Sequence, residues 1–269
     1  MRWPASSEPF PVPHRALGRL RDAARLHLGF AALAALCLVS STLGSAAALL
    51  MRPARRGPFA RRLICWIFGT HLRLMERLGA VRLDLSALDT LEGEPPLVLA
   101  PNHPSMIDAA LMLSRLTRLT CVMKADILEN PLFGVGARMA GYITNDPPRQ
   151  MMRAAGDSLQ DGRHLLLFPE GTRTRQRPLN ALQRTAGVIA RRAGVPVQTL
   201  IIETSSPFLC KGWPLFRAPA MPLVYRVRLG RRFDPPADVE AFTSELEAYF
   251  QQELATARLP PLPLPPDAR

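Results

Sequence analysis

Residues 102–108 contain the first pair of side chains whose types and spacing suggest a reaction. The segment reads Asn-His-Pro-Ser-Met-Ile-Asp, so His103 precedes Asp108 by five positions. Ser105 and Asp108 also match the pattern of a helix capping box, and we expect a helix over 106–116. In such a helix start, the Asp108 carboxylate could reach back to a ring nitrogen of His103. A carboxylate there fixes the imidazole tautomer and stabilises the imidazolium, which makes His103 a better general base.

The proton that this base removes is expected to come from a substrate, because no nucleophile accompanies His103. The sequence has no Gly-x-Ser-x-Gly segment, and no cysteine lies near His103 along the chain. A substrate hydroxyl is therefore the expected nucleophile. The backbone N–H groups that follow Pro104 are candidates to stabilise the oxyanion that its attack would create.

Residues 168–173 form a second segment with chemical potential, Phe-Pro-Glu-Gly-Thr-Arg, after a strand expected over 164–168. Gly171 permits an unusual backbone turn and close approach of a ligand. Arg173, with Arg175 and Arg177 nearby, offers planar donors suited to a phosphate. A lone arginine in a turn is usually an ordinary surface residue, but this six-residue combination is too specific for that interpretation alone.

The elements that must position both segments alternate between strand and helix. Apolar runs predict strands over 97–100, 119–123, 164–168, 195–203 and 223–229. Helices are predicted over 106–116, 131–140, 149–161 and 180–193, and a last helix carries Val239, Phe242, Leu246, Phe250 and Leu254. This alternation predicts an α/β domain over 80–257, with a mixed, partly parallel sheet flanked by helices. A Pro-rich tail follows over 258–269.

The N-terminal region has the composition of a membrane attachment. Residues 26–51 contain no charged side chain. This segment is longer than the roughly 20 residues that cross a bilayer core. Residues 1–77 hold twelve arginines and three acidic residues, so most of the net charge of +12 lies here. We expect a basic arm over 1–25, a membrane helix or helical hairpin over 26–51, and an amphipathic interfacial helix over 52–79.

Other interpretations of this region are a signal peptide or a buried helix of a soluble protein for 26–51, and a helix packed on the domain for 52–79. Nucleic-acid binding is disfavoured, because the basic residues bracket an apolar span. Four scattered cysteines, without a Cys-x-x-Cys pattern, indicate neither a disulfide framework nor a cysteine zinc site.

Together, segments 102–108 and 168–173 resemble the glycerolipid acyltransferase family, of the 1-acyl-sn-glycerol-3-phosphate (lysophosphatidate) type. The resemblance runs from about residue 97 to about residue 202. It implies that His103 is the general base on an acceptor hydroxyl, and that Asp108 orients it. The acceptor would be a lysophospholipid such as 1-acyl-glycerol-3-phosphate, and the donor an acyl thioester of coenzyme A or acyl carrier protein. It also implies substrate contacts from Glu170, Gly171, Thr172, Arg173 and Lys124, and neither a metal nor a cofactor.

Two departures from the family pattern affect the acceptor. After Gly141 the chain reads Tyr-Ile-Thr-Asn-Asp-Pro-Pro, and the next arginine is Arg149. The block at Pro196-Val-Gln-Thr lacks a second proline. The first stretch is similar to acyltransferases of specialised fatty-acid or polyene pathways, which implies that the acceptor could instead be a non-standard lipid.

Two further functions are compatible with the same residues. A membrane-tethered hydrolase would use His103 and Asp108 to activate water in place of a lipid hydroxyl. A non-catalytic lipid-binding protein would keep the fold without the reaction. Release of thiol that depends on a lipid alcohol distinguishes transfer from both of these functions.

The expected partners follow from these assignments. They are the lipid bilayer, a lysophospholipid acceptor and the acyl-CoA or acyl carrier protein donor, without nucleic acid. The expected location is the membrane, at the cytoplasmic face of a bacterial inner membrane.

Overall fold

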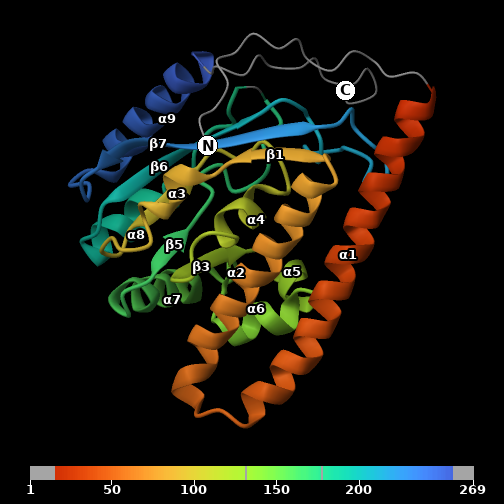
Figure 1. Cartoon of the computed structure of the whole chain (residues 1–269). Helices are drawn as coiled ribbons and strands as arrows, with labels where there is room; N and C mark the ends of the chain where they lie inside the picture. The colour runs from red at the N-terminus through yellow and green to blue at the C-terminus, as the bar shows by residue number, and fades with distance from the viewer. Residues whose placement is uncertain (1–15, 131, 177, 257–269) are drawn as a thin grey trace.

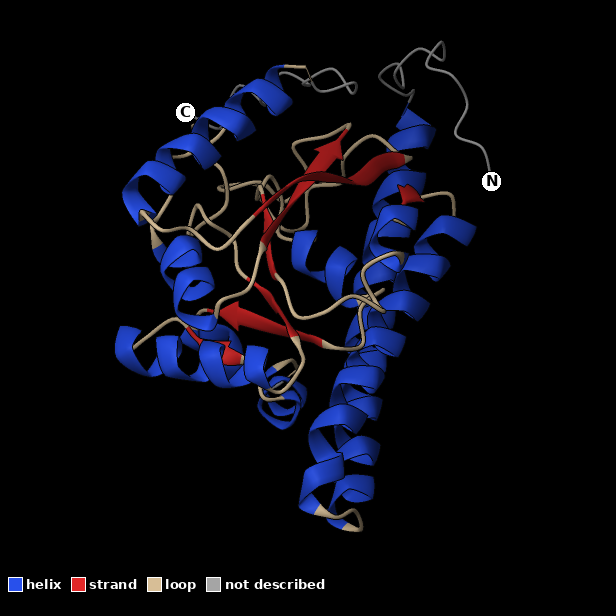
Figure 2. Ribbon diagram, turned by 90° about the vertical axis from the view of Figure 1, so that its left-hand side faces the viewer, coloured by secondary structure: helices blue, strands red, loops and turns tan. Residues whose placement is uncertain are grey.

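The central strand of the sheet, β2 (Val98–Pro101), is apolar and buried at every position. A strand covered on both faces has such a continuous apolar run, because neither set of alternating side chains meets water. Leu99 joins one buried apolar cluster, whereas Val98 and Ala100 join the other. The computed structural model describes residues 16–256 except 131 and 177, and shows this sheet between two layers of helices (Figures 1 and 2).

The sheet has seven strands in the order β1-β7-β6-β2-β5-β3-β4. All neighbouring strands run parallel except β6 and β7, which are antiparallel. The prediction of a mixed, partly parallel sheet flanked by helices is confirmed. Besides β2, the strands are β1 (Val81–Asp84), β3 (Leu119–Met123), β4 (Ile143–Thr144), β5 (His164–Leu166), β6 (Val197–Thr204) and β7 (Leu223–Phe233).

The helices divide between the two faces of the sheet. The cluster that contains Leu99 includes side chains from α2 (Pro53–Arg77), α4 and α6, and the cluster that contains Val98 includes side chains from α7, α8 and α9. These and the remaining short helices of the domain are α3 (Ser86–Asp89), α4 (Asp108–Leu113), α5 (Ala125–Glu129), α6 (Gly134–Ala140), α7 (Pro148–Gln160), α8 (Thr185–Ala193) and α9 (Val239–Ala255).

The N-terminal region forms a helical hairpin of α1 (Ala16–Leu49) and α2 (Pro53–Arg77). Its turn projects beyond the rest of the domain in both views (Figures 1 and 2). Helix α1 begins at Ala16, within the segment expected as a basic arm. Asp22 and Leu26 are buried, so packing against the domain favours a helix that starts before residue 26. Residues 1–15 and the Pro-rich tail lie outside the described residues. Residues Leu17–Leu49 are, by length and composition, long and apolar enough to cross a membrane.

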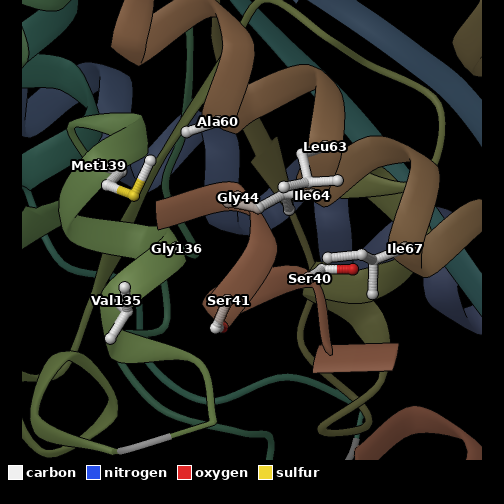
Figure 3. Close-up of a pocket in the computed structure, with 10 residues that line it drawn as sticks. All are labelled: Ser40, Ser41, Gly44, Ala60, Leu63, Ile64, Ile67, Val135, Gly136 and Met139. Atoms are coloured by element: carbon white, nitrogen blue, oxygen red, sulfur yellow. The ribbon is translucent and has the colours of Figure 1, made fainter. Parts of the chain in front are cut away.

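Small residues let the middle of α1 approach α2 and α6. Figure 3 shows the crevice between these helices, which Ser40, Ser41 and Gly44 line from α1. A side chain at Gly44 would collide with Leu63 of α2, since an added Cβ would lie 2.7 Å from its Cδ2. The crevice has a volume of only about 20 Å³. This is room for about one water molecule, so the crevice reflects helix packing and is no lipid site.

One predicted helix begins later than expected. Helix α8 starts at Thr185 instead of residue 180, because Asn180 makes hydrogen bonds that are incompatible with a helix. Its N–H donates to Glu170, and its side-chain oxygen accepts from the N–H groups of Arg175 and Gln176. These bonds hold the described residues around Asn180 in a loop that follows the second chemical segment.

Candidate active site

Parallel pairing brings the two chemical segments together. Strands β2 and β5 are neighbours and run parallel, so the residues that follow each strand emerge at the same edge of the sheet. Strands β3 and β6 end there too, and we call it the carboxyl edge. In open α/β sheets this edge is where ligands bind.

His103 and Asp108 are in direct contact. The Nδ1 atom of His103 lies 2.8 Å from Oδ2 of Asp108. The histidine side chain is 16% exposed, whereas that of Asp108 is fully buried. A proton on Nδ1, donated to the carboxylate, leaves Nε2 free to accept another proton. This is the arrangement that a general base requires.

Asp108 is held in place by the turn that precedes α4. Its Oδ2 accepts a second hydrogen bond, from the Ser105 N–H at 2.7 Å, which is one half of the predicted capping box. The Ser105 hydroxyl instead donates to the Phe208 carbonyl at 2.8 Å. Burial raises the pKa of Asp108, and the bond from His103 opposes that rise. Oδ1 of Asp108 is buried without a hydrogen-bond partner among the described residues.

The backbone donors expected to stabilise an oxyanion after Pro104 are already engaged. The Ser105 N–H donates to Asp108, and the Met106 N–H donates to the Leu209 carbonyl at 3.1 Å. An N–H that is bonded within the protein cannot also serve a substrate at no cost. Positive side chains at the carboxyl edge are the remaining candidates for that charge stabilisation.

Glu170, expected as a substrate contact, has both carboxylate oxygens hydrogen-bonded within the protein. Its carboxylate is buried, and both oxygens accept hydrogen bonds: Oε1 from the N–H of His103 and the hydroxyl of Thr174, and Oε2 from the N–H of Asn180, each at 2.9 Å. The Thr174 N–H also donates to the His103 carbonyl at 2.8 Å. Glu170 and the adjacent Thr174 thus hold the His103 backbone on both sides. Burial raises the pKa of Glu170, and these donors limit the rise.

Gly171 and Arg173 fit their places in the loop for different reasons. Gly171 has a positive φ of 66°, which favours glycine, and an added Cβ would displace the end of the Gln183 side chain. Thr172 is half-buried between them. Arg173 donates from Nη1 to the carbonyls of Leu209 and Cys210, at 2.8 and 3.1 Å. Its positive charge is near enough to favour ionised Asp108.

Four cationic side chains gather near the pair formed by His103 and Asp108. The positive charges of Arg175, then Lys124 and Arg173, lower the pKa of Lys211. We call these four residues the cationic cluster. No carboxylate lies within ion-pair distance of any of them in the part of the chain that the structure describes. The chain has only two lysines, Lys124 and Lys211, and both belong to this cluster.

Sequence reasoning gave no role to two features of the site. The Phe168 ring stacks on the His103 imidazole, with centroids 3.8 Å apart and an interplanar angle of 20°. The other feature is the loop over residues 205–222, whose carbonyls accept bonds from Ser105, Met106 and Arg173. Phe168 could have been suspected from its place in the second segment, whereas the loop carries no recognisable motif.

Replacing Phe168 by leucine is expected to lower kcat by about 3- to 10-fold, with KM little changed. Stacked rings contribute about 0.5–1.5 kcal/mol beyond burial, and without the stack the imidazole is less firmly oriented. Phe168→Tyr keeps the ring and is the matched control. Steady-state kinetics check this, and equal losses in the leucine and tyrosine variants would contradict it.

Arg149, the arginine displaced from its usual family position, lines a different groove. This groove of about 280 Å³ lies between α7 and α8 and is also lined by Arg153 and Arg192. Arg149 is therefore not part of the cationic cluster. Among the described residues, no group of three or more His, Cys, Asp or Glu side chains could hold a metal ion.

The fold and site define an α/β domain with a His–Asp pair at the carboxyl edge, and comparisons identify its relatives. The sequence model of the acyltransferase family matches residues 69–203. A lyso-ornithine lipid O-acyltransferase of Pseudomonas aeruginosa is 32% identical over 67% of this chain and 70% of its own length. A chloroplastic 1-acyl-sn-glycerol-3-phosphate acyltransferase of Brassica napus is 29% identical over 49% of this chain, which spans only 40% of that protein.

A solved structure shares the fold. The 1-acyl-sn-glycerophosphate acyltransferase PlsC of Thermotoga maritima superposes with a TM-score of 0.70 and 16% identity, covering 90% of this chain and 99% of that one. The chain belongs to the acyltransferase family, among the glycerolipid acyltransferases that include lysophosphatidate enzymes.

Proposed function

We propose that this enzyme transfers a fatty acyl group from a thioester, of coenzyme A or acyl carrier protein, to the free hydroxyl of an anionic lysophospholipid such as 1-acyl-glycerol-3-phosphate. The observation that carries the proposal is the contact between His103 Nδ1 and buried Asp108, beside the unpaired cationic cluster. Glu170, Gly171 and Thr172 shape the loop that holds the base, and Lys124 and Arg173 face the acceptor phosphate.

The proposed chemistry uses the protein's own side chains. His103 Nε2 takes the proton of the acceptor hydroxyl as its oxygen attacks the thioester carbonyl carbon. The tetrahedral intermediate collapses with cleavage of the carbon–sulfur bond, and the thiolate leaving group takes up a proton, which protonated His103 can return. Asp108 stabilises the imidazolium between the two steps.

The acceptor class follows from charge. The head group of an acceptor that bears a phosphate is expected to bind more favourably near four cations that lack carboxylate partners. A zwitterionic head group is expected to gain less binding free energy there. The double variant Lys124→Gln/Lys211→Gln is expected to raise KM for a lysophosphatidate acceptor by about 3- to 10-fold, with kcat little changed. The effect should shrink as salt is raised.

The matched control for this variant is Arg191→Gln/Arg192→Gln, which removes the same charge from exposed positions on α8. KM values measured for both variants at low and high salt check the assignment. An equal rise in the two variants would reduce it to a general effect of net charge.

A second acceptor is suggested by one relative. The lyso-ornithine lipid enzyme of Pseudomonas aeruginosa matches more of this chain than the Brassica napus protein does, and at higher identity. A lyso-ornithine lipid, or another non-standard lipid or polyene acceptor, is therefore the alternative.

For the membrane, we infer that the hairpin lies in one leaflet, at the cytoplasmic face of a bacterial inner membrane. Helix α1 has 34 residues and is about 50 Å long, well beyond a hydrocarbon core of about 30 Å. Helix α2 packs along it and carries the exposed Arg62, which a spanning hairpin would place in lipid. Exposed apolar side chains on α1, such as Leu28, Leu38 and Leu43, suit insertion from one side.

The deciding experiment offers purified enzyme a panel of acyl-CoA and acyl carrier protein donors with lysophosphatidate, lyso-ornithine lipid or no acceptor. Thiol release that requires a lipid alcohol supports transfer. Release without any acceptor would indicate a hydrolase, and no release, together with a silent His103→Ala variant, would indicate a lipid-binding protein. Transfer to lyso-ornithine lipid alone would replace the anionic acceptor by the alternative.

A further inference from the structure

The loop over residues 205–222, here called the β6–β7 loop, lies at the carboxyl edge and is fixed to the active site. Its carbonyls accept hydrogen bonds from the Ser105 hydroxyl, the Met106 N–H and the Arg173 guanidinium, at 2.8, 3.1 and 2.8 Å. These donors belong to both chemical segments. A displacement of the loop would therefore be felt at the turn that holds Asp108 and at Arg173.

The same loop is fixed to α1. The Met221 N–H donates to Asp22 Oδ2 at 3.3 Å. The Phe216 ring stacks with the His27 imidazole, at 5.9 Å between centroids, and meets the Phe30 ring edge-on at 6.3 Å. The loop thus continues the surface that α1 presents.

The tip of the loop is a built structure that presents apolar side chains to solvent. The Trp213 indole N–H donates to the Arg217 carbonyl at 3.0 Å, and its ring packs edge-on against Phe208. Between them, Leu215 is 43% exposed and Phe216 is 67% exposed. Exposing two such side chains side by side costs free energy in water, so they suit a surface that is covered in use.

The distribution of exposed apolar side chains identifies that covering surface. Within the described ranges, every other large hydrophobic residue of high exposure lies on α1 and its turn, at Trp66 of α2, or at Met106 and Ile127 near the site. Helices α7, α8 and α9, on the opposite face of the sheet, have none. The apolar exposure therefore follows one side of the molecule, from the hairpin to the carboxyl edge.

We propose that the β6–β7 loop is a second lipid-contacting element, which inserts Leu215 and Phe216 into the anionic leaflet beside α1. The occupant is a phospholipid bilayer, because the apolar tip is continuous with α1 and is flanked by cations at Lys211 and Arg217 that suit anionic head groups. Contact at the tip would bring the carboxyl edge down to the lipid surface, where an acceptor with one acyl chain resides. This proposal rests on the membrane seat of α1 given under the proposed function.

The test compares two variants of the full chain with the same change in charge. Leu215→Glu/Phe216→Glu places two carboxylates at the tip, and Gln251→Glu/Gln252→Glu places two on exposed positions of α9. Partitioning onto vesicles of phosphatidylethanolamine and phosphatidylglycerol is measured by flotation, without substrate. We expect the tip variant to partition about 10-fold or more weakly than wild type, and the α9 variant to match wild type.

A second measurement separates lipid contact from structural damage. Transfer to a water-soluble, short-chain lysophosphatidate should be unchanged in the tip variant, whereas transfer to the same lipid in vesicles should fall. Leu215→Met/Phe216→Trp keeps the apolar tip and should restore both partitioning and vesicle activity.

Two results would overturn the proposal: a tip variant that partitions like the α9 variant, or one that loses activity equally on soluble and vesicle acceptors. Failure of the proposed acyl transfer is a separate result, since wild type would then act on neither acceptor. Vesicle partitioning would still decide whether the loop contacts lipid.

Discussion

Replacing His103 by alanine is expected to lower kcat by about 10²–10⁴-fold, the usual contribution of a positioned general base. The fold should persist, because the bonds that fix this residue in the chain involve its backbone. Its N–H donates to Glu170 and its carbonyl accepts from Thr174, and alanine keeps both. Acyl-transfer rates, with circular dichroism to verify folding, check this.

The same variant also discriminates among mechanisms. Retention of more than about a tenth of the wild-type kcat would exclude His103 as the base. Binding of the acceptor should be largely preserved, since the cationic cluster does not involve the imidazole. A large rise in KM with unchanged kcat would contradict the assigned role.

Replacing Asp108 by asparagine is the second change with a large expected effect, also a fall in kcat of about 10²–10⁴-fold. Asparagine has nearly the same shape, and its oxygen could accept from both Ser105 and His103 as Oδ2 does now. It lacks the negative charge that stabilises the imidazolium. Kinetics of Asp108→Asn beside Asp108→Glu, which keeps the charge, check whether charge is what matters.

The charge of Asp108 is expected to support kcat but to lower the free energy of unfolding as pH rises. Burial raises the pKa of Asp108 above its ordinary value of 3.8, so the folded protein holds this proton more tightly than the unfolded chain does. The free energy of unfolding therefore falls as pH rises from the ordinary pKa through the raised one. Asparagine does not titrate, so its stability relative to aspartate should improve over this range.

The stability comparison is cleanest in a His103→Ala background, where the neighbouring imidazole cannot titrate. Chemical denaturation of His103→Ala and His103→Ala/Asp108→Asn at mildly acidic and neutral pH measures the difference. A difference that stays constant with pH would show that the buried carboxyl keeps its ordinary pKa.

The pairing of His103 with Asp108 could be predicted from sequence because it is local. Five positions and the start of one helix are enough to define the contact, and the capping pattern indicated where that helix begins. The convergence of the two segments also followed from sequence, since strands that alternate with helices favour parallel pairing and a shared carboxyl edge.

The role of Glu170 and the position of the β6–β7 loop could not be predicted in this way. Glu170 was expected to be a substrate ligand, and only the folded contacts with His103, Thr174 and Asn180 show that its oxygens are occupied. The loop has no periodic pattern, and its contacts lie about a hundred residues away in the sequence, as with Ser105 and Phe208.

Strand β1 was missed for a similar reason. Its four residues, Val-Arg-Leu-Asp, alternate between apolar and polar side chains but are too few for the pattern to be distinctive. Pairing with the distant β7 is what holds them extended. The contacts of the β6–β7 loop and of strand β1 join segments that are remote in sequence, where local preferences carry little information.

The hairpin has a structural consequence for handling the protein. Leu26 of α1 and Leu72 and Met75 of α2 belong to the same apolar cluster as Leu99 of the central strand. Cutting the chain after residue 77 would remove buried side chains of the apolar core as well as the exposed apolar side chains of α1. The hairpin and the α/β domain are therefore one folding unit, and the full chain suits purification better than a fragment trimmed after residue 77.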